Sequence, residues 1–287
     1  MMAPPREDAA QVPYPRTLAH LSDVHFGKIS DDRIVGALVS EVNASGVDLV
    51  VVSGDLTQRA RTSQFQQARA MLDAFDPPVL VVPGNHDVRA WWHNPIDRLW
   101  RPDKRFREHI TDDLAPAVAV PGLAVLGLNS AHGRTIKGGR IRPDHVDAIN
   151  AFFRDQPEEA FRILTLHHHL LRLEGLGSHD VSRGASRALD AAHRARVDLI
   201  LCGHLHRSHV APIQLAPAGD EGRHRIVVAS AGTATSSRGR GDNAGVNIYN
   251  WIRVGSDEFS VSERRFDNAA GRFQEARVST FERVGLG

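Results

Sequence analysis

The stretch Val79-Leu80-Val81-Val82-Pro83-Gly84-Asn85-His86-Asp87 decides the fold class of this 287-residue chain, because an aliphatic run stops abruptly at a polar cluster. A short apolar run bounded by Pro and Gly is typical of a buried strand. The same arrangement occurs twice before it. Residues 17–21 lead to Asp23-Val24-His25, and residues 48–53 lead to Gly54-Asp55.

Helical patterns separate these three strands. Asp31 or Asp32 can cap the first helix, which we expect to end near Asn43, and Thr62 can cap the second. Their apolar faces consist of Ile34, Leu38 and Val42, and of Phe65, Ala68 and Leu72. Strand–helix alternation predicts an α/β sheet with parallel strands, which bind ligands beyond their carboxyl ends. The three polar clusters should therefore meet at one edge.

Two further polar clusters follow the same rule later in the chain. The expected strand at 161–166 ends at His167-His168-His169, and the expected strand at 197–202 ends at Gly203-His204-Leu205-His206. Helices are expected after Pro143 and over about 182–194. The remaining strands are expected at 117–120, 123–128, 225–229, 246–254 and 258–266. Cys202 ends an apolar strand and is expected to be part of the core.

The bulk composition excludes several classes of protein. Formal net charge is +1 and no block of like charge occurs, so nothing favours a nucleic-acid polymer as partner. The apolar runs are too short to cross a bilayer, and the Pro- and Ala-rich start has no signal-peptide core. One cysteine allows no intramolecular disulfide, which favours a reducing compartment and a cytoplasmic location. Oligomeric state is left open.

We expect residues 1–15 to form a flexible leader and residues 16–287 a single domain. An insertion at about 88–115 is rich in Trp and Arg and is expected to be helical. No repeat and no interdomain linker interrupt the rest.

The five clusters together supply the ligands of two adjacent divalent metals. Asp23 and His25 are two residues apart, as are His204 and His206, so each pair points to one side of an extended chain. Asp55 can bridge two ions because a carboxylate has two oxygens. Mixed nitrogen and oxygen ligands suit Mn, Fe, Zn or Co better than Mg.

The order of these clusters along the chain resembles the calcineurin-like metallophosphoesterase superfamily. Within it, the chain is most similar to bacterial class III cyclic nucleotide phosphodiesterases and glycerophosphodiesterases. The resemblance covers residues 17–235 and implies a four-layer αββα sandwich, with two mixed β-sheets flanked by helices. One departure is visible: His167-His168-His169-Leu170 stands where those enzymes often have His-His-Pro-Pro.

The resemblance also implies a role for each residue. One metal would be held by Asp23, His25 and His206, the other by Asn85, His167 and His204, and Asp55 would bridge them. His169 competes with His167 as the ligand, because the triple histidine leaves the register open. His86 would act on the phosphoryl oxygen or leaving group, and Asp87 would orient it.

The implied activity is hydrolysis of a small phosphodiester, by in-line attack of a metal-bridging hydroxide. A cyclic nucleotide or a glycerophosphodiester is the expected substrate. Two alternatives are a pyrophosphatase for a substrate of the UDP-diacylglucosamine type and an inactive scaffold with the same fold. Candidate substrate contacts are Arg238, Arg240, Trp91 and His169. Aromatic residues at helical spacing, such as the Trp residues of the insertion, more often pack against the body of a protein.

Overall fold

The structure is a computed structural model and describes residues 14–89, 95–134, 137–213 and 225–283. Trp91, Trp92 and residues 1–13 of the expected leader lie outside the described residues. Among the described helices, none combines the length and the apolar character that a membrane span needs.

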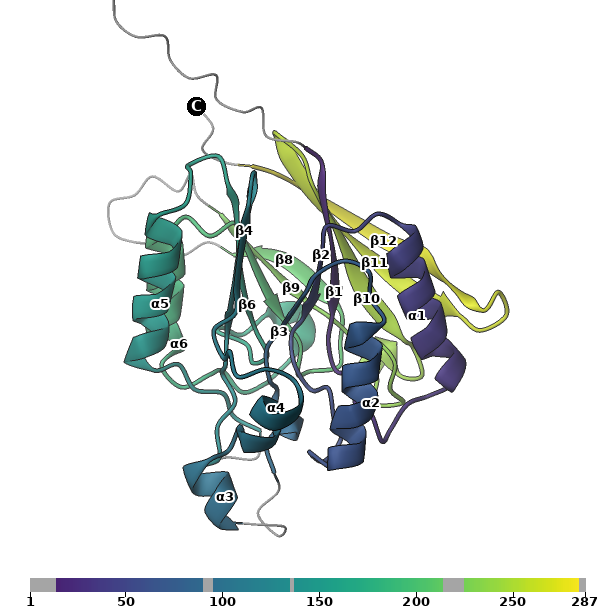
Figure 1. The fold of residues 1–287 in the computed structure, drawn as a ribbon. Coiled ribbons are helices and arrows are strands. Elements are labelled where there is room, and N and C mark those ends of the chain that lie inside the picture. The colour runs from purple at the N-terminus through teal and green to yellow at the C-terminus, as the bar shows by residue number, and fades with distance from the viewer. Residues whose placement is uncertain (1–13, 90–94, 135–136, 214–224, 284–287) are drawn as a thin grey trace, which may run out of the picture.

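Two six-stranded sheets lie face to face in the middle of the molecule (Figure 1). Both sheets are mixed, since β1-β2-β3 and β5-β6-β7-β9 run parallel and the other neighbours pair antiparallel. In spatial order the first sheet consists of β12 (Arg272–Glu282), β11 (Glu258–Asp267), β10 (Ile248–Val254), β1 (Arg16–Leu21), β2 (Leu49–Val52) and β3 (Val79–Val81). The second consists of β4 (Ala117–Val120), β5 (Leu123–Leu128), β6 (Phe161–Leu166), β7 (Leu199–Cys202), β9 (Ile226–Ser230) and β8 (His209–Ile213).

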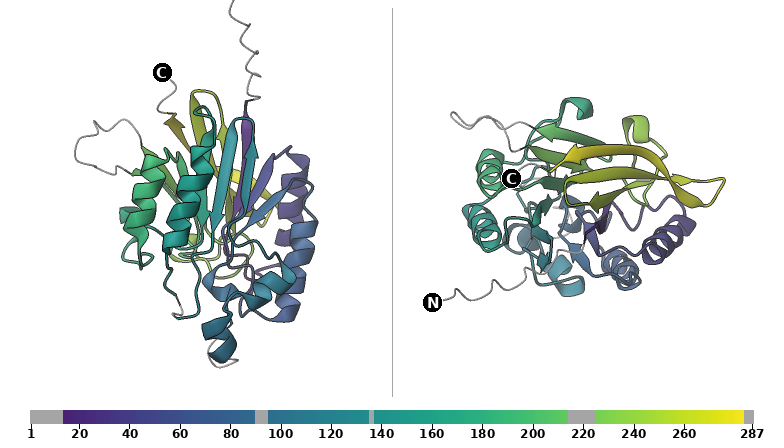
Figure 2. Two further views of the ribbon diagram at one scale, coloured as in Figure 1. Left: turned by 60° about the vertical axis from the view of Figure 1, so that its left-hand side comes forward. Right: turned by 90° about the horizontal axis from the view of Figure 1, so that it is seen from above.

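Four helices cover the outer faces of this sandwich (Figures 1 and 2). The first sheet is covered by α1 (Asp32–Ala44) and α2 (Thr62–Asp73), and the second by α5 (Pro143–Arg154) and α6 (Ala185–Arg194). The expected four-layer αββα arrangement is confirmed. Two short helices, α3 (Pro95–Trp100) and α4 (Lys104–His109), lie at the end of the molecule toward which the parallel strands run.

The alternation of apolar side chains along β2 explains the layering. Val50 and Val52 pack under the helices, whereas Leu49 and Val51 pack between the two sheets. Successive side chains of a strand point to opposite faces, so a continuous apolar run is required wherever both faces are covered. All four residues are buried.

Two strands and one helix cap differ from the sequence expectation. β8 and β12 were not predicted: β8 carries Pro212 on a sheet edge, where a missing backbone donor is tolerated, and β12 is an edge strand with mostly exposed side chains. Neither presents the apolar pattern on which strand prediction depends. At the start of α2 the N-cap is Arg61, and Thr62 is the first helical residue.

Candidate metal centre

Asp23, His25, Asp55 and His206 form a buried cluster at the carboxyl ends of β1, β2 and β7. The nearest ligand atoms of the four residues all lie within 4.8 Å of one another. Asp23 Oδ1 is 3.5 Å from His25 Nε2 and 3.2 Å from His206 Nε2. Asp55 Oδ2 is 3.6 Å from His25 Nε2. Two carboxylates and two imidazoles therefore face a common point.

A second cluster adjoins the first through Asp55. The same Asp55 Oδ2 lies 3.3 Å from His167 Nε2, and that nitrogen is 3.2 Å from Asn85 Oδ1. His204 Nδ1 approaches Asn85 Oδ1 to 2.9 Å. Asp55 thus faces both clusters, as a bridging carboxylate would.

Backbone carbonyls fix the tautomers of three of these histidines. Nδ1 of His25 donates to Thr57 O, Nδ1 of His167 to Ser53 O and Nδ1 of His206 to Arg238 O, at 3.3, 2.8 and 3.0 Å. In the neutral ring only one nitrogen carries hydrogen, so each Nε2 presents a lone pair to the cluster. This is the usual arrangement behind a metal-ligating histidine.

Two buried carboxylate oxygens without a hydrogen-bond partner indicate that the site fits divalent ions. Asp23 Oδ1 and Asp55 Oδ2 are buried and accept no hydrogen bond, although a buried charge without a partner is costly. Ligands at about 2.0–2.2 Å from one ion lie about 3.0–3.5 Å apart, which agrees with the separations above. The centre is therefore a potential dinuclear metal site of His and Asp residues.

Strained backbone accompanies the ligands. Asp23, His25, Asp55, His204 and His206 all have φ between 52° and 74°, the left-handed region that side chains other than glycine rarely adopt. Such conformations cost of order 1–3 kcal/mol each and concentrate at functional sites. Five of the seven candidate ligands have this backbone conformation, which indicates that the loops are held in a strained form in order to direct these side chains.

The glycines of the motifs allow the loops to approach one another. A Cβ on Gly54 would lie 2.8 Å from both the Gly84 nitrogen and His167 Nδ1. A Cβ on Gly84 would collide with the Asp55 side chain, and one on Gly203 with Ser22 and Asp23. Glycine is therefore required at each of these three positions by close contact, independently of any turn preference.

Burial and mutual charge set the protonation of the cluster. Burial opposes ionisation of Asp23, but His206 and His25 hold its pKa below the usual range, and His167 does the same for Asp55. Burial lowers the pKa of His206 to about 4 and that of His204 to about 3. Although burial opposes it, the Asp55 carboxylate raises the pKa of His167 to about 9, so this ring holds a proton at neutral pH that a bound metal would displace. The two carboxylates are thus ionised and His204 and His206 are neutral, the forms that bind metals.

The His86 ring lies beside the first cluster, next to His25. Its ring is edge-on to His25 with centroids 4.9 Å apart, and its Nδ1 donates to Gln58 O at 2.8 Å. The backbone nitrogen of His86 donates to Asp55 Oδ1 at 2.8 Å. Nε2 of His86 is the ring nitrogen left for a substrate, because Nδ1 is held by Gln58.

The expectation that Asp87 orients His86 is wrong. The Asp87 carboxylate accepts hydrogen bonds from the backbone nitrogens of Leu56, Thr57 and Gly84, at 3.2, 2.8 and 2.9 Å, and from Thr57 Oγ1. Asp87 follows His86 in a tight 3₁₀ turn, Asn85–Asp87, so the two side chains leave in different directions. Asp87 therefore joins the loop at 54–57 to the loop at 84–87 by hydrogen bonds, and Gln58 O orients the His86 ring.

The structure also separates the other candidates. His169 points away from both clusters, with Nε2 3.1 Å from Gly203 O and Nδ1 3.5 Å from the buried Cys202, so the register favours His167. Arg238 is half-buried and donates to Gln58 Oε1 at 2.9 Å. Its guanidinium interacts electrostatically with the carboxylates of Asp55 and Asp23. Arg240 is exposed. Trp91 lies outside the described residues.

Gln58, which contacts both His86 and Arg238, was not singled out from the sequence. It lacks a motif of its own, and the only signal in the sequence is its closeness to Gly54-Asp55. The segment that leads to Arg238 is buried over 233–236, where Thr233 Oγ1 donates to Asp23 O at 2.7 Å and Thr235 Oγ1 donates to Val24 O at 2.9 Å.

Comparison with known proteins places this centre among metal-dependent phosphoesterases. A family model described as calcineurin-like phosphoesterase matches residues 16–208. The glycerophosphodiester phosphodiesterase GpdQ of Enterobacter lignolyticus is 37% identical over 86 residues, which cover 25% of this chain and 30% of that protein. The chain thus spans under a third of that relative's length.

Two longer matches cover more of both proteins. A probable cyclic nucleotide phosphodiesterase of Synechococcus is 22% identical over 71% of this chain and 78% of its own length. The 3',5'-cyclic adenosine monophosphate phosphodiesterase CpdA of Haemophilus influenzae is 25% identical over 66% and 69%.

Solved structures agree on the fold. Purple acid phosphatase PPD1 from yellow lupin superposes with a TM-score of 0.68 at 12% identity, over 94% of this chain and 54% of that one. A dimetal phosphatase from Danio rerio has a TM-score of 0.56 at 13% identity, over 93% and 98%.

Proposed function

The chain belongs to the calcineurin-like phosphoesterase family, and from that premise we propose that it hydrolyses a small phosphodiester with two divalent metal ions. The observation that carries this proposal is the convergence of lone pairs from His25, His206 and His167 on the unpaired oxygens of Asp23 and Asp55. Only bound cations satisfy such an arrangement without protonating it. The names of the relatives favour a cyclic nucleotide or a glycerophosphodiester as substrate.

Each ligand has a place in this proposal. Asp23, His25 and His206 would hold one ion, Asn85, His167 and His204 would hold the other, and Asp55 would contribute to both. Bound together, the ions would supply activated water at neutral pH and neutralise charge on the phosphoryl oxygens. Mn, Fe, Zn and Co all suit the mixed donor set.

The remaining residues position the substrate and its leaving group. Nδ1 of His86 donates to Gln58 O and the ring lies edge-on to His25, so Nε2 is the nitrogen that would stabilise or protonate a departing oxygen. Arg238, held by Gln58 Oε1, is placed to neutralise a phosphoryl oxygen. Gln58 thereby couples the orientation of the two side chains.

Hydrolysis of bis-p-nitrophenyl phosphate and of p-nitrophenyl phosphate by the metal-loaded chain tests the proposal. We expect turnover of the diester to exceed that of the monoester. A panel of cyclic nucleotides, glycerophosphodiesters and a substrate of the UDP-diacylglucosamine type then identifies the class. Absence of turnover with Mn, Fe, Zn and Co supplied in turn would mean that the chain is a scaffold.

A further inference from the structure

A small basic pocket lies outside the metal centre, at the same end of the molecule. Its volume is about 100 Å³, and its lining consists of Arg89, Arg101, Pro102, Lys104, Arg105 and Glu108. Four cations thus face one carboxylate. A cavity needs about 10–15 Å³ for each water that it holds, so this pocket has room for a tetrahedral group with four oxygens.

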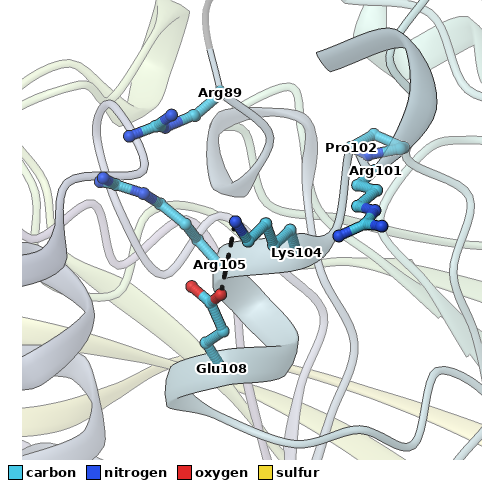
Figure 3. A pocket seen from close by; sticks show the side chains of 6 residues that line it. All are labelled: Arg89, Arg101, Pro102, Lys104, Arg105 and Glu108. Atoms are coloured by element: carbon cyan, nitrogen blue, oxygen red, sulfur yellow. Dashed lines mark ion pairs between the residues drawn. The ribbon is translucent and has the colours of Figure 1, made fainter. Parts of the chain in front are cut away.

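The cations that line the pocket come from the segment after His86 and from the start of α4. Figure 3 shows the Arg89 and Arg105 side chains extending in the same direction, while the Lys104 ammonium faces Glu108, from which it is separated by 3.8 Å. Lys104 and Glu108 are about half-exposed and lie four residues apart on one helix, so their attraction is weak. Guanidinium groups match the geometry of phosphate oxygens, and two of them line this wall.

The walls of the pocket are fixed to the body of the protein. Helix α4 carries Lys104 and Arg105, and its Phe106 is fully buried in the core with Phe65 of α2. Arg105 Nη1 donates to Ala60 O at 2.8 Å. The buried Arg98 donates to the carbonyl of Arg89 and to Gly133 O. Cations held in place by such contacts are suited to bind a ligand with little loss of entropy.

The pocket is linked to the catalytic loop at two points. Arg89 follows His86 by three residues, so their Cα atoms are at most about 11 Å apart. Ala60, which Arg105 contacts, follows Gln58 by two residues, and the Gln58 carbonyl holds the ring of His86. The pocket therefore adjoins the two chain segments that carry His86 and Gln58.

We propose that the pocket of Arg89, Arg101, Lys104 and Arg105 binds a second phosphate group of the substrate, so that the preferred diester also carries a phosphate monoester. This inference rests on the proposed function, since it names the substrate class of the same site. Free phosphate shares the recognition chemistry, and the experiment separates the two sources.

The test compares two diesters that differ only in the second phosphate. Thymidine 5'-(p-nitrophenyl phosphate) is assayed with and without a 3'-phosphate, using the metal-loaded chain. We expect the 3'-phosphorylated diester to have a kcat/KM at least about tenfold higher, because charge-assisted hydrogen bonds of this kind contribute at that scale. Wild-type values of kcat/KM that are equal for the two diesters would overturn the inference.

Substitutions assign the preference to the pocket. The double variant Lys104→Gln/Arg105→Gln and the single variant Arg101→Gln should lower the preference, the former by about tenfold or more. Arg107→Gln is the matched control, because Arg107 is on the same helix but pairs with Asp103 and Asp112 at 3.7 and 3.1 Å. Thermal unfolding shows whether the variants are folded. A preference that is the same in the folded Arg101→Gln variant and in Arg107→Gln contradicts the assignment.

Two further measurements keep the inference distinct from the proposed function. Calorimetric titration needs no turnover: thymidine 3',5'-bisphosphate should bind about tenfold more tightly than thymidine 5'-phosphate, and the double variant should lose this difference. Equal binding overturns the inference even if neither diester is hydrolysed. Stimulation of the unphosphorylated diester by inorganic phosphate, with equal kcat/KM for the two diesters, would identify a free effector and also overturn it.

Discussion

His25 Nε2 and His206 Nε2 face each other at 3.2 Å, and each ring already donates its Nδ1 hydrogen to a backbone carbonyl. Two lone pairs at this distance repel unless a cation or a proton lies between them. Burial lowers the pKa of His206 to about 4, which disfavours the proton at neutral pH. The relationship between these two rings is therefore the local reason to expect a metal.

Removal of one of these rings should remove one ion. His206→Ala leaves Asp23 and His25 to hold the first ion, while Asn85, His167 and His204 still hold the second. We expect metal analysis after dialysis to fall from two ions per chain to about one. His209→Ala on β8, outside both clusters, is the control and should keep two. A His206→Ala variant with two firmly bound ions would show that this residue is no ligand.

Loss of the His86 side chain should slow the reaction without emptying the site. The ring belongs to neither ligand cluster, and its Nδ1 donates to Gln58 O, which leaves Nε2 for a substrate. General acid catalysis contributes about 10²–10⁴-fold, so kcat of His86→Ala on the diester should fall by that range. Metal content should stay at the wild-type value. If metal were lost instead, His86 would be a ligand and the assignment would be incorrect.

Substitution of Gly54, with Gly36 as the control, tests whether the close approach of the loops requires glycine. A Cβ at Gly54 meets Gly84 and His167 at 2.8 Å and the residue has φ +94°, whereas a Cβ at Gly36 on α1 meets nothing within 4 Å. Gly54→Ala should therefore lower the melting temperature and the metal content. Gly36→Ala should leave metal content unchanged and raise stability by about 0.5–1 kcal/mol, since it is in a helix. Equal effects would contradict the steric argument.

Acid sensitivity of the metal-free protein should depend in part on His145. Burial lowers the pKa of this α5 histidine from 6.5 to about 4. A pKa lower in the folded state means that stability is fully present above pH 6.5 and is lost as pH falls toward 4. Denaturant unfolding in EDTA at pH 7 and pH 4.5 should show a smaller loss for His145→Gln than for wild type. His193→Gln on α6 is the control, and an unchanged loss in both variants would remove His145 as a cause.

The parts of the fold that follow a periodic rule could be predicted from the sequence. Continuous apolar runs such as 49–52 identified strands buried on both faces, and the spacing of Ile34, Leu38 and Val42 identified α1. Two edge strands were not predicted: β12 is exposed over most of its length, and β8 is interrupted by Pro212. Exposure removes the selection for apolar side chains on which such prediction depends.

The candidate ligands could be found because metal chemistry restricts residue type at strand ends. The residue that orients the His86 ring could not be predicted from residue type in the same way. Asp87 is adjacent to His86, yet its carboxylate binds backbone nitrogens of the neighbouring loop. Gln58 O, a backbone atom that any residue supplies, orients the ring instead. Contacts made by backbone atoms do not restrict residue type, so they cannot be predicted from the sequence.

Anomalous diffraction from crystals of the chain loaded with Mn²⁺ shows whether two ions bind and which residues hold them. We expect two metal peaks: one in contact with Asp23, His25 and His206, the other with Asn85, His167 and His204, and Asp55 in contact with both. A single peak, or peaks held by His168 or His169 in place of His167, would contradict this expectation.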